Sequence, residues 1–151
     1  MRHTIKITKE KAIDVQALNG RVLVVFTLNG AEAMRQEIER MPALLAAASL
    51  SAAARMAEAN PAYETDRVAS VKVAPGKYFT VWPSAGRVVL NVDIWGMSLA
   101  TNEVDVHTAA ALATAIELSS AEIGAGARCH GDQCAAGQMA CPSPKACGVA
   151  V

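Results

Sequence analysis

The sequence has no cysteine before position 129, and its four cysteines all follow within the C-terminal segment: Cys129, Cys134, Cys141 and Cys147. Disulfides and thiolate metal sites are therefore excluded from the whole chain before Cys129, which must be stabilised by packing and hydrogen bonds. Thiols that cluster in a polar tail are rarely core residues. They predict a metal site, disulfides or redox chemistry in the tail.

The sequence also lacks an excess of either charge. Fourteen Lys and Arg residues balance fourteen Asp and Glu residues, and the basic residues are scattered singly along the chain. Binding to nucleic acid through a broad cationic face needs clustered Lys and Arg, because each contact neutralises a phosphate. The charge pattern therefore argues against a nucleic-acid partner.

Long hydrophobic runs are missing as well. No window approaches the roughly 20 apolar residues that span a bilayer, and the N-terminus alternates apolar and polar residues from Ile5 onward. This start does not resemble a secretory signal. We therefore expect a cytoplasmic protein without membrane contact, in a compartment where thiols stay reduced unless a metal holds them.

No catalytic signature is evident. The sequence contains no glycine-rich phosphate loop, nucleophile elbow or His-x-x-x-His pair. Asp105 and His107 can be interpreted as an acid–base pair, but their place at a predicted helix start favours a capping carboxylate beside an exposed histidine. We therefore do not expect an enzyme.

Aromatic residues are few, and two of them are candidates for partner binding. Val88, Leu90, Val92 and Ile94 alternate on one side of a predicted strand, which places Trp95 on the opposite side. Trp82 stands before Pro83 at another strand end. Because exposed tryptophans are typical hot spots of protein interfaces, Trp82 and Trp95 are the predicted contact residues.

The residues before the tail predict eight strands and two helices. Alternation of apolar and polar residues, with turn signals such as Asn29-Gly30 between them, indicates antiparallel hairpins. Pro42 suits the first turn of a helix that reaches about Glu58, and Asp105 can cap a second helix from Val106 to about Glu122. Gly124-Ala125-Gly126 is interpreted as the end of that second helix.

The two halves of this pattern repeat. Gly20-Arg21-Val22-Leu23 matches Gly86-Arg87-Val88-Val89, and Gly30 matches Gly96. Both matches are 66 residues apart along the chain, and we call this separation the repeat spacing. Leu45 and Leu112 in the helices are paired with a drift of one position. We predict an α+β fold of two ββββα units with pseudo-twofold symmetry, antiparallel sheets and two Ala-rich helices. The expected boundaries are 1–59 and 67–124 for the units, 60–66 for a linker and 125–151 for the Cys-rich tail.

One such unit buries only one face of a sheet, which is too little for independent stability. The two units are therefore expected to pack on each other, either helix on helix or through joined sheet edges. Runs of alanine in both helices allow close approach of the helix axes. The same faces can instead meet a second chain, so a homodimer is a further expectation.

The cysteine spacing C-x4-C-x6-C-x5-C permits several interpretations. Four thiolates can hold zinc in a tetrahedron, and His130 can substitute for one of them. The C-x2-C knuckle of zinc ribbons is absent, and the spacing fits an iron–sulfur cluster less well. Two disulfides or four free thiols remain open. We favour a structural zinc ion that cross-links the tail and takes no part in catalysis.

The segment from Cys134 to Cys147, with Gly137 and the turn Pro142-Ser143-Pro144, resembles Cys-rich tails of small proteins encoded by bacteriophages and mobile elements of proteobacteria. The resemblance covers this segment alone and implies a phage origin, with no known activity. The leading hypothesis is a non-enzymatic protein-binding accessory factor, for example an inhibitor of a bacterial host protein such as an anti-CRISPR protein. The alternatives are a virion or assembly protein that oligomerises and a small metal-dependent enzyme.

Overall fold

The structure, a computed structural model, describes residues 1–62 and 69–128. The chain divides into two compact units, Met1–Ser119 and Ser120–Val151, and the boundary falls within the last helix. All eight strands and the first helix belong to the first unit. Residues 120–128 form the C-terminal turns of the last helix and are the described part of the second unit.

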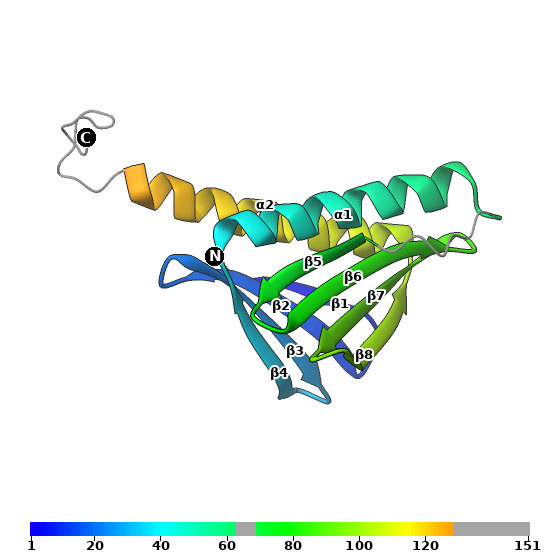
Figure 1. The fold of residues 1–151 in the computed structure, drawn as a ribbon, viewed down its shortest axis with the longest axis horizontal. Coiled ribbons are helices and arrows are strands. Elements are labelled where there is room, and N and C mark those ends of the chain that lie inside the picture. The colour runs from blue at the N-terminus through cyan, green and yellow to red at the C-terminus, as the bar shows by residue number, and fades with distance from the viewer. Residues whose placement is uncertain (63–68, 129–151) are drawn as a thin grey trace. The chain divides into compact units, whose positions relative to one another are not determined.

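The order of elements is ββββα followed by ββββα (Figure 1). The first repeat comprises β1 (His3–Lys6), β2 (Lys11–Leu18), β3 (Arg21–Leu28), β4 (Ala31–Ile38) and α1 (Arg40–Ala59). The second comprises β5 (Ala69–Ala74), β6 (Lys77–Ser84), β7 (Arg87–Ile94), β8 (Met97–Val104) and α2 (Val106–Arg128). Each repeat forms one antiparallel sheet whose strands pair in chain order. The predicted α+β fold and the duplicated ββββα layout are confirmed.

The repeat spacing that links Gly20 to Gly86 holds throughout this part of the chain. It relates the first residues of β2, β3, β4 and α1 (Lys11, Arg21, Ala31, Arg40) to those of β6, β7, β8 and α2 (Lys77, Arg87, Met97, Val106). Irregularities follow it too, because the register shift between Phe26 and Thr27 recurs between Val92 and Asp93. A register shift at the same position of both sheets is a specific feature of two related hairpins, since such shifts change the direction of the strand that carries them.

Four hairpin turns have positive φ at both central residues: Asn19-Gly20, Asn29-Gly30, Ala85-Gly86 and Trp95-Gly96. This geometry matches the right-handed twist of the flanking strands and favours Asn and Gly. Trp95 is an exception among bulky residues, with φ of 54°. Strand β7 ends at Ile94, and Trp95 and Gly96 form the turn that follows it.

The start of α2 agrees with the sequence and its end does not. The Asp105 Oδ1 atom accepts a hydrogen bond from the Thr108 backbone N–H at 2.7 Å, and this bond lowers the pKa of the Asp105 carboxyl. The predicted end near Glu122 is wrong, because the helix continues through Gly124 and Gly126 to Arg128. Glycine disfavours a helix by only about 1 kcal/mol relative to alanine, so these glycines weaken the last turns without ending them.

The predicted pairing of equivalent residues in the two helix sequences is also wrong. The repeat spacing pairs Leu112 with Ala46, and Leu45 with Ala111. Leu112 is 3% exposed and Ala46 2%, whereas Leu45 is 53% exposed. The drift of one position does not exist. Leu45 was chosen because it is the nearest leucine, although it lies on the outer side of α1.

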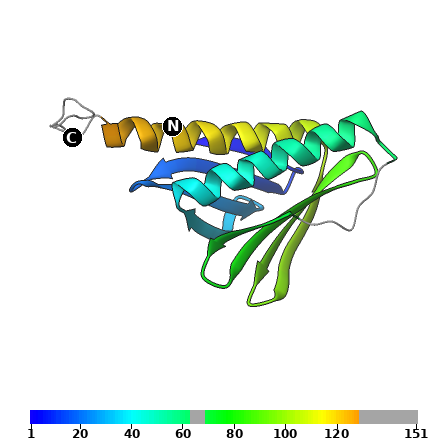
Figure 2. The same cartoon turned by 45° about the horizontal axis from the view of Figure 1, so that its top comes forward.

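Helix α1 packs chiefly on β5, β6 and β7, which belong to the other repeat. Figures 1 and 2 show it lying across the second sheet. Its buried side is made mostly of small residues: Ala43, Ala46, Ala47, Leu50, Ala53, Ala54 and Ala57. Small side chains let the helix approach the sheet closely, so one repeat completes the hydrophobic layer of the other.

Two hydrogen bonds join the sheets and show the pseudo-twofold symmetry at atomic detail. The Lys11 Nζ atom in β2 donates to Asn102 Oδ1 in β8 at 3.3 Å. The Lys77 Nζ atom in β6 donates to Gln36 Oε1 in β4 at 3.1 Å. The repeat spacing relates Lys11 to Lys77 and Gln36 to Asn102. The same contact is therefore made twice with the repeats exchanged, as in the interface of a twofold dimer.

Among the residues that the structure describes, neither helix is long and apolar enough to traverse a lipid bilayer.

Candidate functional site

The four cysteines and His130, predicted as zinc ligands, lie outside the described residues, so the zinc site stays a prediction. Within residues 1–62 and 69–128 no group of three or more His, Cys, Asp or Glu side chains is arranged to hold a metal ion. The other predicted site residues, Trp82 and Trp95, are both described. They belong to the second sheet, with Trp82 half-buried in β6 and Trp95 exposed in the turn after β7.

Side chains on the two sides of the second sheet differ in character. Phe79 and Val81 of β6 point toward the helices, whereas Tyr78, Thr80 and Trp82 point to the opposite side. The strand register aligns the outward residues in rows: Ser70, Thr80, Asn91 and Thr101; Lys72, Tyr78, Asp93 and Ser98; and Trp82, Val89 and Glu103. We call these rows, with Trp95, the second-sheet face.

A polar network organises the middle of the second-sheet face. Asn91 is only 8% exposed, and its Oδ1 atom accepts hydrogen bonds from Ser98 Oγ at 2.5 Å and Thr101 Oγ1 at 2.6 Å. Its Nδ2 atom donates to Asp93 Oδ1 at 2.9 Å. Because these partners fix the amide orientation, the hydroxyl and carboxylate groups around it are held in place before any ligand arrives.

Trp95 extends the second-sheet face at the β7–β8 turn. Its side chain is 77% exposed, and its backbone N–H donates to Gly76 O at 2.8 Å. A Cβ atom at Gly76 would approach ring atoms of Trp95 to 2.7 Å, so the indole rests directly on the glycine backbone. An exposed but supported indole offers a large apolar surface at a small cost in conformational entropy.

Substitution of Gly76 is expected to displace this indole. We expect Gly76→Ala to destabilise the protein by about 1–2 kcal/mol, because φ is +72° there and the new methyl group meets the ring. Gly96→Ala is the matched control, since φ is +81° and nothing lies within 4 Å of its added Cβ. Urea unfolding gives the stabilities and tryptophan fluorescence reports the indole environment. Equal effects of the two substitutions would show that the ring does not rest on Gly76.

The equivalent face of the first sheet has a different composition. Its residues at the same repeat positions are Thr4, Lys6, Ala12, Asp14, Gln16, Leu23, Val25, Thr27, Asn29, Glu32, Arg35 and Glu37. Trp82 replaces Gln16, Tyr78 replaces Ala12 and Trp95 replaces Asn29. In the first sheet Glu32 accepts two hydrogen bonds from Arg35, at 2.9 and 3.1 Å, which lower the pKa of the Glu32 carboxyl. Two faces on one scaffold have thus diverged, one toward charged groups and one toward aromatic groups.

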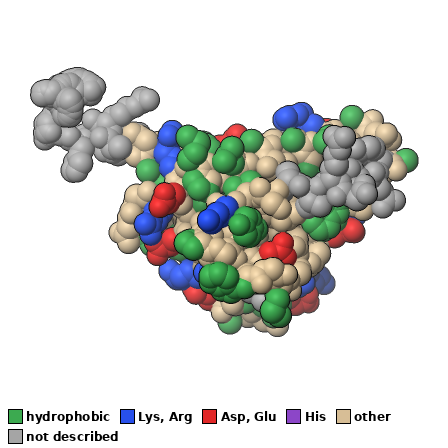
Figure 3. Space-filling model, viewed as in Figure 1, with side chains coloured by type: hydrophobic (Ala, Val, Ile, Leu, Met, Phe, Trp, Pro, Cys, Tyr) green, Lys and Arg blue, Asp and Glu red, His purple; other side chains and the backbone are tan. Residues whose placement is uncertain are grey.

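Neither sign of charge dominates the side of the molecule that Figure 3 shows. In the space-filling view, hydrophobic side chains lie among scattered acidic and basic groups, and neither sign forms a continuous patch (Figure 3). On the second-sheet face Lys72 is accompanied by Asp93 and Glu103, and the Arg87 Nε atom pairs with Glu103 Oε1 at 3.0 Å. The face is therefore aromatic and polar with little net charge.

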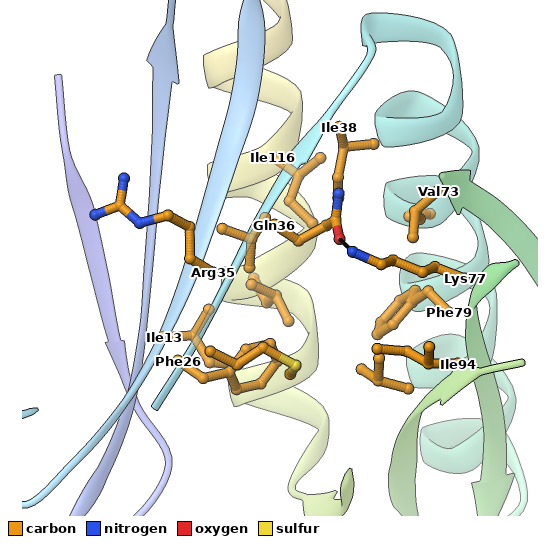
Figure 4. A pocket seen from close by; sticks show the side chains of 15 residues that line it. Ile13, Phe26, Arg35, Gln36, Ile38, Val73, Lys77, Phe79, Ile94 and Ile116 are labelled. Carbon is orange, nitrogen blue, oxygen red and sulfur yellow. Dashed lines mark hydrogen bonds between the residues drawn. The ribbon is translucent and has the colours of Figure 1, made fainter. Parts of the chain in front are cut away.

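An interior cavity of about 90 Å³ lies between the sheets and the helices. Figure 4 shows Ile13 and Phe26 of the first sheet on one side of it, with Phe79 and Ile94 of the second sheet opposite. Ala46 of α1 and Leu112 and Ile116 of α2 complete the lining. The duplication explains the cavity in part, because Ala46 occupies the position where the second repeat has Leu112.

Two open grooves adjoin the cavity. One of about 630 Å³ shares Phe26, Met34 and Ile94 with it and contains Lys11 and Asn102. The other, of about 580 Å³, shares Lys77 and Gln36 with it and includes Arg21, Lys72 and the carboxylates of Glu37 and Glu39. Each groove therefore contains one of the two symmetry-related bonds between a lysine and an amide.

No protein-family model matches this sequence, and no curated protein is detectably similar to it.

Sequence reasoning named both tryptophans as candidates but missed most of their setting. Asn91, Thr80 and Tyr78 were not recognised, although strand alternation places them on the same side as Trp82. Comparison of the two repeats position by position is a signal that finds Tyr78, because Ala12 stands at the matching position of the first repeat. The cavity has no such signal, since its walls come from six strands and both helices.

Proposed function

We propose that this chain is a non-enzymatic protein-binding accessory factor that binds its partner through the second-sheet face. The observation that carries the proposal is the divergence of two equivalent sheet faces. One copy has Gln16 and Asn29, where the other has Trp82 and Trp95. A change confined to one copy is hard to attribute to packing, because both sheets perform the same structural role in the fold.

The composition of the second-sheet face suits a protein ligand. Interface centres are enriched in Trp and Tyr and depleted in charge. Ser, Thr and Asn around them supply hydrogen bonds, as in antibody combining sites. Tyr78 is 39% exposed and Trp95 77%, so both aromatic surfaces are accessible. The hydroxyls of Ser98 and Thr101 belong to the same face and are oriented by Asn91.

The charge of the second-sheet face favours a protein over a nucleic acid. Base stacking on Trp and Tyr is possible in principle, but tight binding to a strand also requires several phosphate contacts. The positive charges of Lys72 and Arg87 are balanced by Asp93 and Glu103 on the same face. A partner of modest charge and exposed apolar or backbone groups fits this surface better.

The nature of the partner rests on the resemblance of the tail alone. A phage-encoded chain would act in the cytoplasm of a bacterial host, where a host protein is the natural target. Inhibition of a host defence protein, as by an anti-CRISPR protein, is one version of this proposal. A homodimer of the full chain stays a prediction beside it.

The test uses substitutions that install the residues of the first repeat in the second. The tagged full chain captures proteins from a bacterial lysate, and the affinity of the recovered partner is then measured by calorimetry. We expect Trp82→Gln and Trp95→Asn each to weaken binding by about tenfold or more, because hot-spot truncations usually cost at least about 2 kcal/mol. Thermal unfolding checks that each variant remains folded.

The control substitutions are Gln16→Ala and Asn29→Ala, at the matching positions of the first sheet. They should leave the affinity within about twofold of the unmodified chain, as expected for residues outside the interface. If both tryptophan variants retain full affinity, the second-sheet face is not the binding surface. If no partner depends on either sheet face, the proposed function is wrong.

A further inference from the structure

The interior cavity carries an inference that does not depend on the proposed protein partner. We propose that it binds the aliphatic chain of a carboxylic acid, whose carboxylate pairs with Lys77. The side chains that enclose it are almost all hydrocarbon, including Ile13, Phe79 and Ile116. The polar groups of the lining, Arg35, Gln36 and Lys77, are few, and the hydrocarbon walls between them favour an apolar guest over water.

Lys77 supplies the position for the acid group. Its side chain is half-buried at the edge of the cavity, and its ammonium group points to Gln36 (Figure 4). The acceptor there is a neutral amide oxygen, and Lys77 forms no ion pair with any described residue. A half-buried ammonium group with a neutral partner gains from a carboxylate, because charge-assisted hydrogen bonds are about twice as strong as neutral ones.

The open groove beside Lys77 provides an entrance suited to an anion. Arg21, Arg35, Lys72 and Lys77 line it together with Glu37 and Glu39. Arg35 pairs with Glu32, and Arg21 pairs with Glu37 and Glu39, so Lys72 and Lys77 are the lining cations without an ion pair among the described residues. Their two charges favour an anionic ligand at this entrance. The Gln36 Nε2 atom donates to Glu37 O at 2.7 Å, so the amide that faces Lys77 is held in place at this entrance.

The volume limits the length of the chain. A cavity of about 150 Å³ holds a benzene molecule, so about 90 Å³ accepts a short aliphatic segment. The larger groove that shares Phe26, Met34 and Ile94 gives room for the rest of a medium-length chain. Octanoate therefore serves as the first probe, with hexanoate and decanoate to define the length preference.

Isothermal calorimetry on the full chain tests the assignment with three probes of equal chain length. Octanoate should bind with one-to-one stoichiometry and raise the melting temperature. Octanol should bind more weakly, because it lacks the charge. Octylammonium should bind weakest of the three, because its charge repels Lys77. Equal affinity for all three probes would overturn the role of Lys77.

Substitutions then locate the ligand. Lys77→Met removes the charge but keeps most of the side-chain length, and it should weaken octanoate binding about tenfold, with little change for octanol. Lys6→Met is the control, since Lys6 is an exposed lysine of the first repeat that lines neither the cavity nor the two grooves beside it. If Lys6→Met weakens octanoate binding as much as Lys77→Met, the acid does not bind at Lys77.

The cavity itself is tested by Ala46→Leu, which installs the residue of the second repeat. The added carbon atoms should fill the void and abolish binding of both octanoate and octanol. Binding that survives in a folded Ala46→Leu protein would place the ligand elsewhere and refute the proposal. Trp82→Gln separates this inference from the proposed function, because it should affect partner binding and leave octanoate binding unchanged.

Discussion

Replacement of Leu50 by alanine is expected to lower the free energy of unfolding by about 3 kcal/mol, within the range of buried Leu→Ala substitutions. Leu50 is fully buried in α1, and the equivalent position of α2 holds Ile116, which is 4% exposed. It is the largest side chain on the buried side of α1, where the other residues are alanines. Its loss therefore opens a void that these small residues cannot fill.

Leu45 is the matched control for this prediction, because it lies in the same helix and is 53% exposed. We expect Leu45→Ala to change the stability by less than about 0.5 kcal/mol, as surface substitutions generally do. Urea unfolding, monitored by circular dichroism, measures the stability of both variants. The slope of the unfolding free energy against urea concentration should be the same in both. Equal losses for Leu45→Ala and Leu50→Ala would mean that the helix buries a different side.

This pair of leucines also shows where sequence reasoning reached its limit. Strands and turns were predictable, because β-branched residues recur along β3 and β7 and Asn-Gly marks two of the hairpins. The rotation of α1 was not predictable. Alanine occurs on its buried side at Ala43 and on its exposed side at Ala48, so the sequence has little contrast between the two sides.

Contacts between the repeats could not be predicted from the sequence, for a different reason. The pairs Lys11–Asn102 and Lys77–Gln36 each join residues that local patterns describe only as polar positions in a strand. Their meeting depends on how two complete sheets are placed. Trp95 is an intermediate case, because the strand pattern predicted its exposure but only the fold brings it onto Gly76.

The packing of α1 on the second sheet leads to the second large prediction, which concerns the first repeat alone. A fragment of residues 1–62 is expected to be unfolded as a monomer. In the full chain α1 packs chiefly on β5, β6 and β7, so the fragment lacks the surface that buries Leu50. A single four-stranded sheet, with a helix that has no partner sheet, buries too little apolar surface to offset the loss of chain entropy.

At higher concentration the same fragment should fold as a homodimer. The last three strands of the two repeats have equal lengths and start at equivalent positions, so a second copy can occupy the place of the second repeat. The two cross-sheet bonds of the full chain would become two identical bonds from Lys11 of one copy to Gln36 of the other. Each copy would then cover the sheet of its neighbour with α1.

Circular dichroism over a range of concentrations and analytical ultracentrifugation test this prediction, because the stability of such a dimer depends on concentration. The control fragment carries Leu50→Asp, which places a charge in the shared core and should prevent both folding and association. A fragment that folds as a monomer at low concentration would show that one repeat is stable without a partner sheet. The interdependence of the two repeats, on which the interior cavity and its proposed ligand rest, would then be lost.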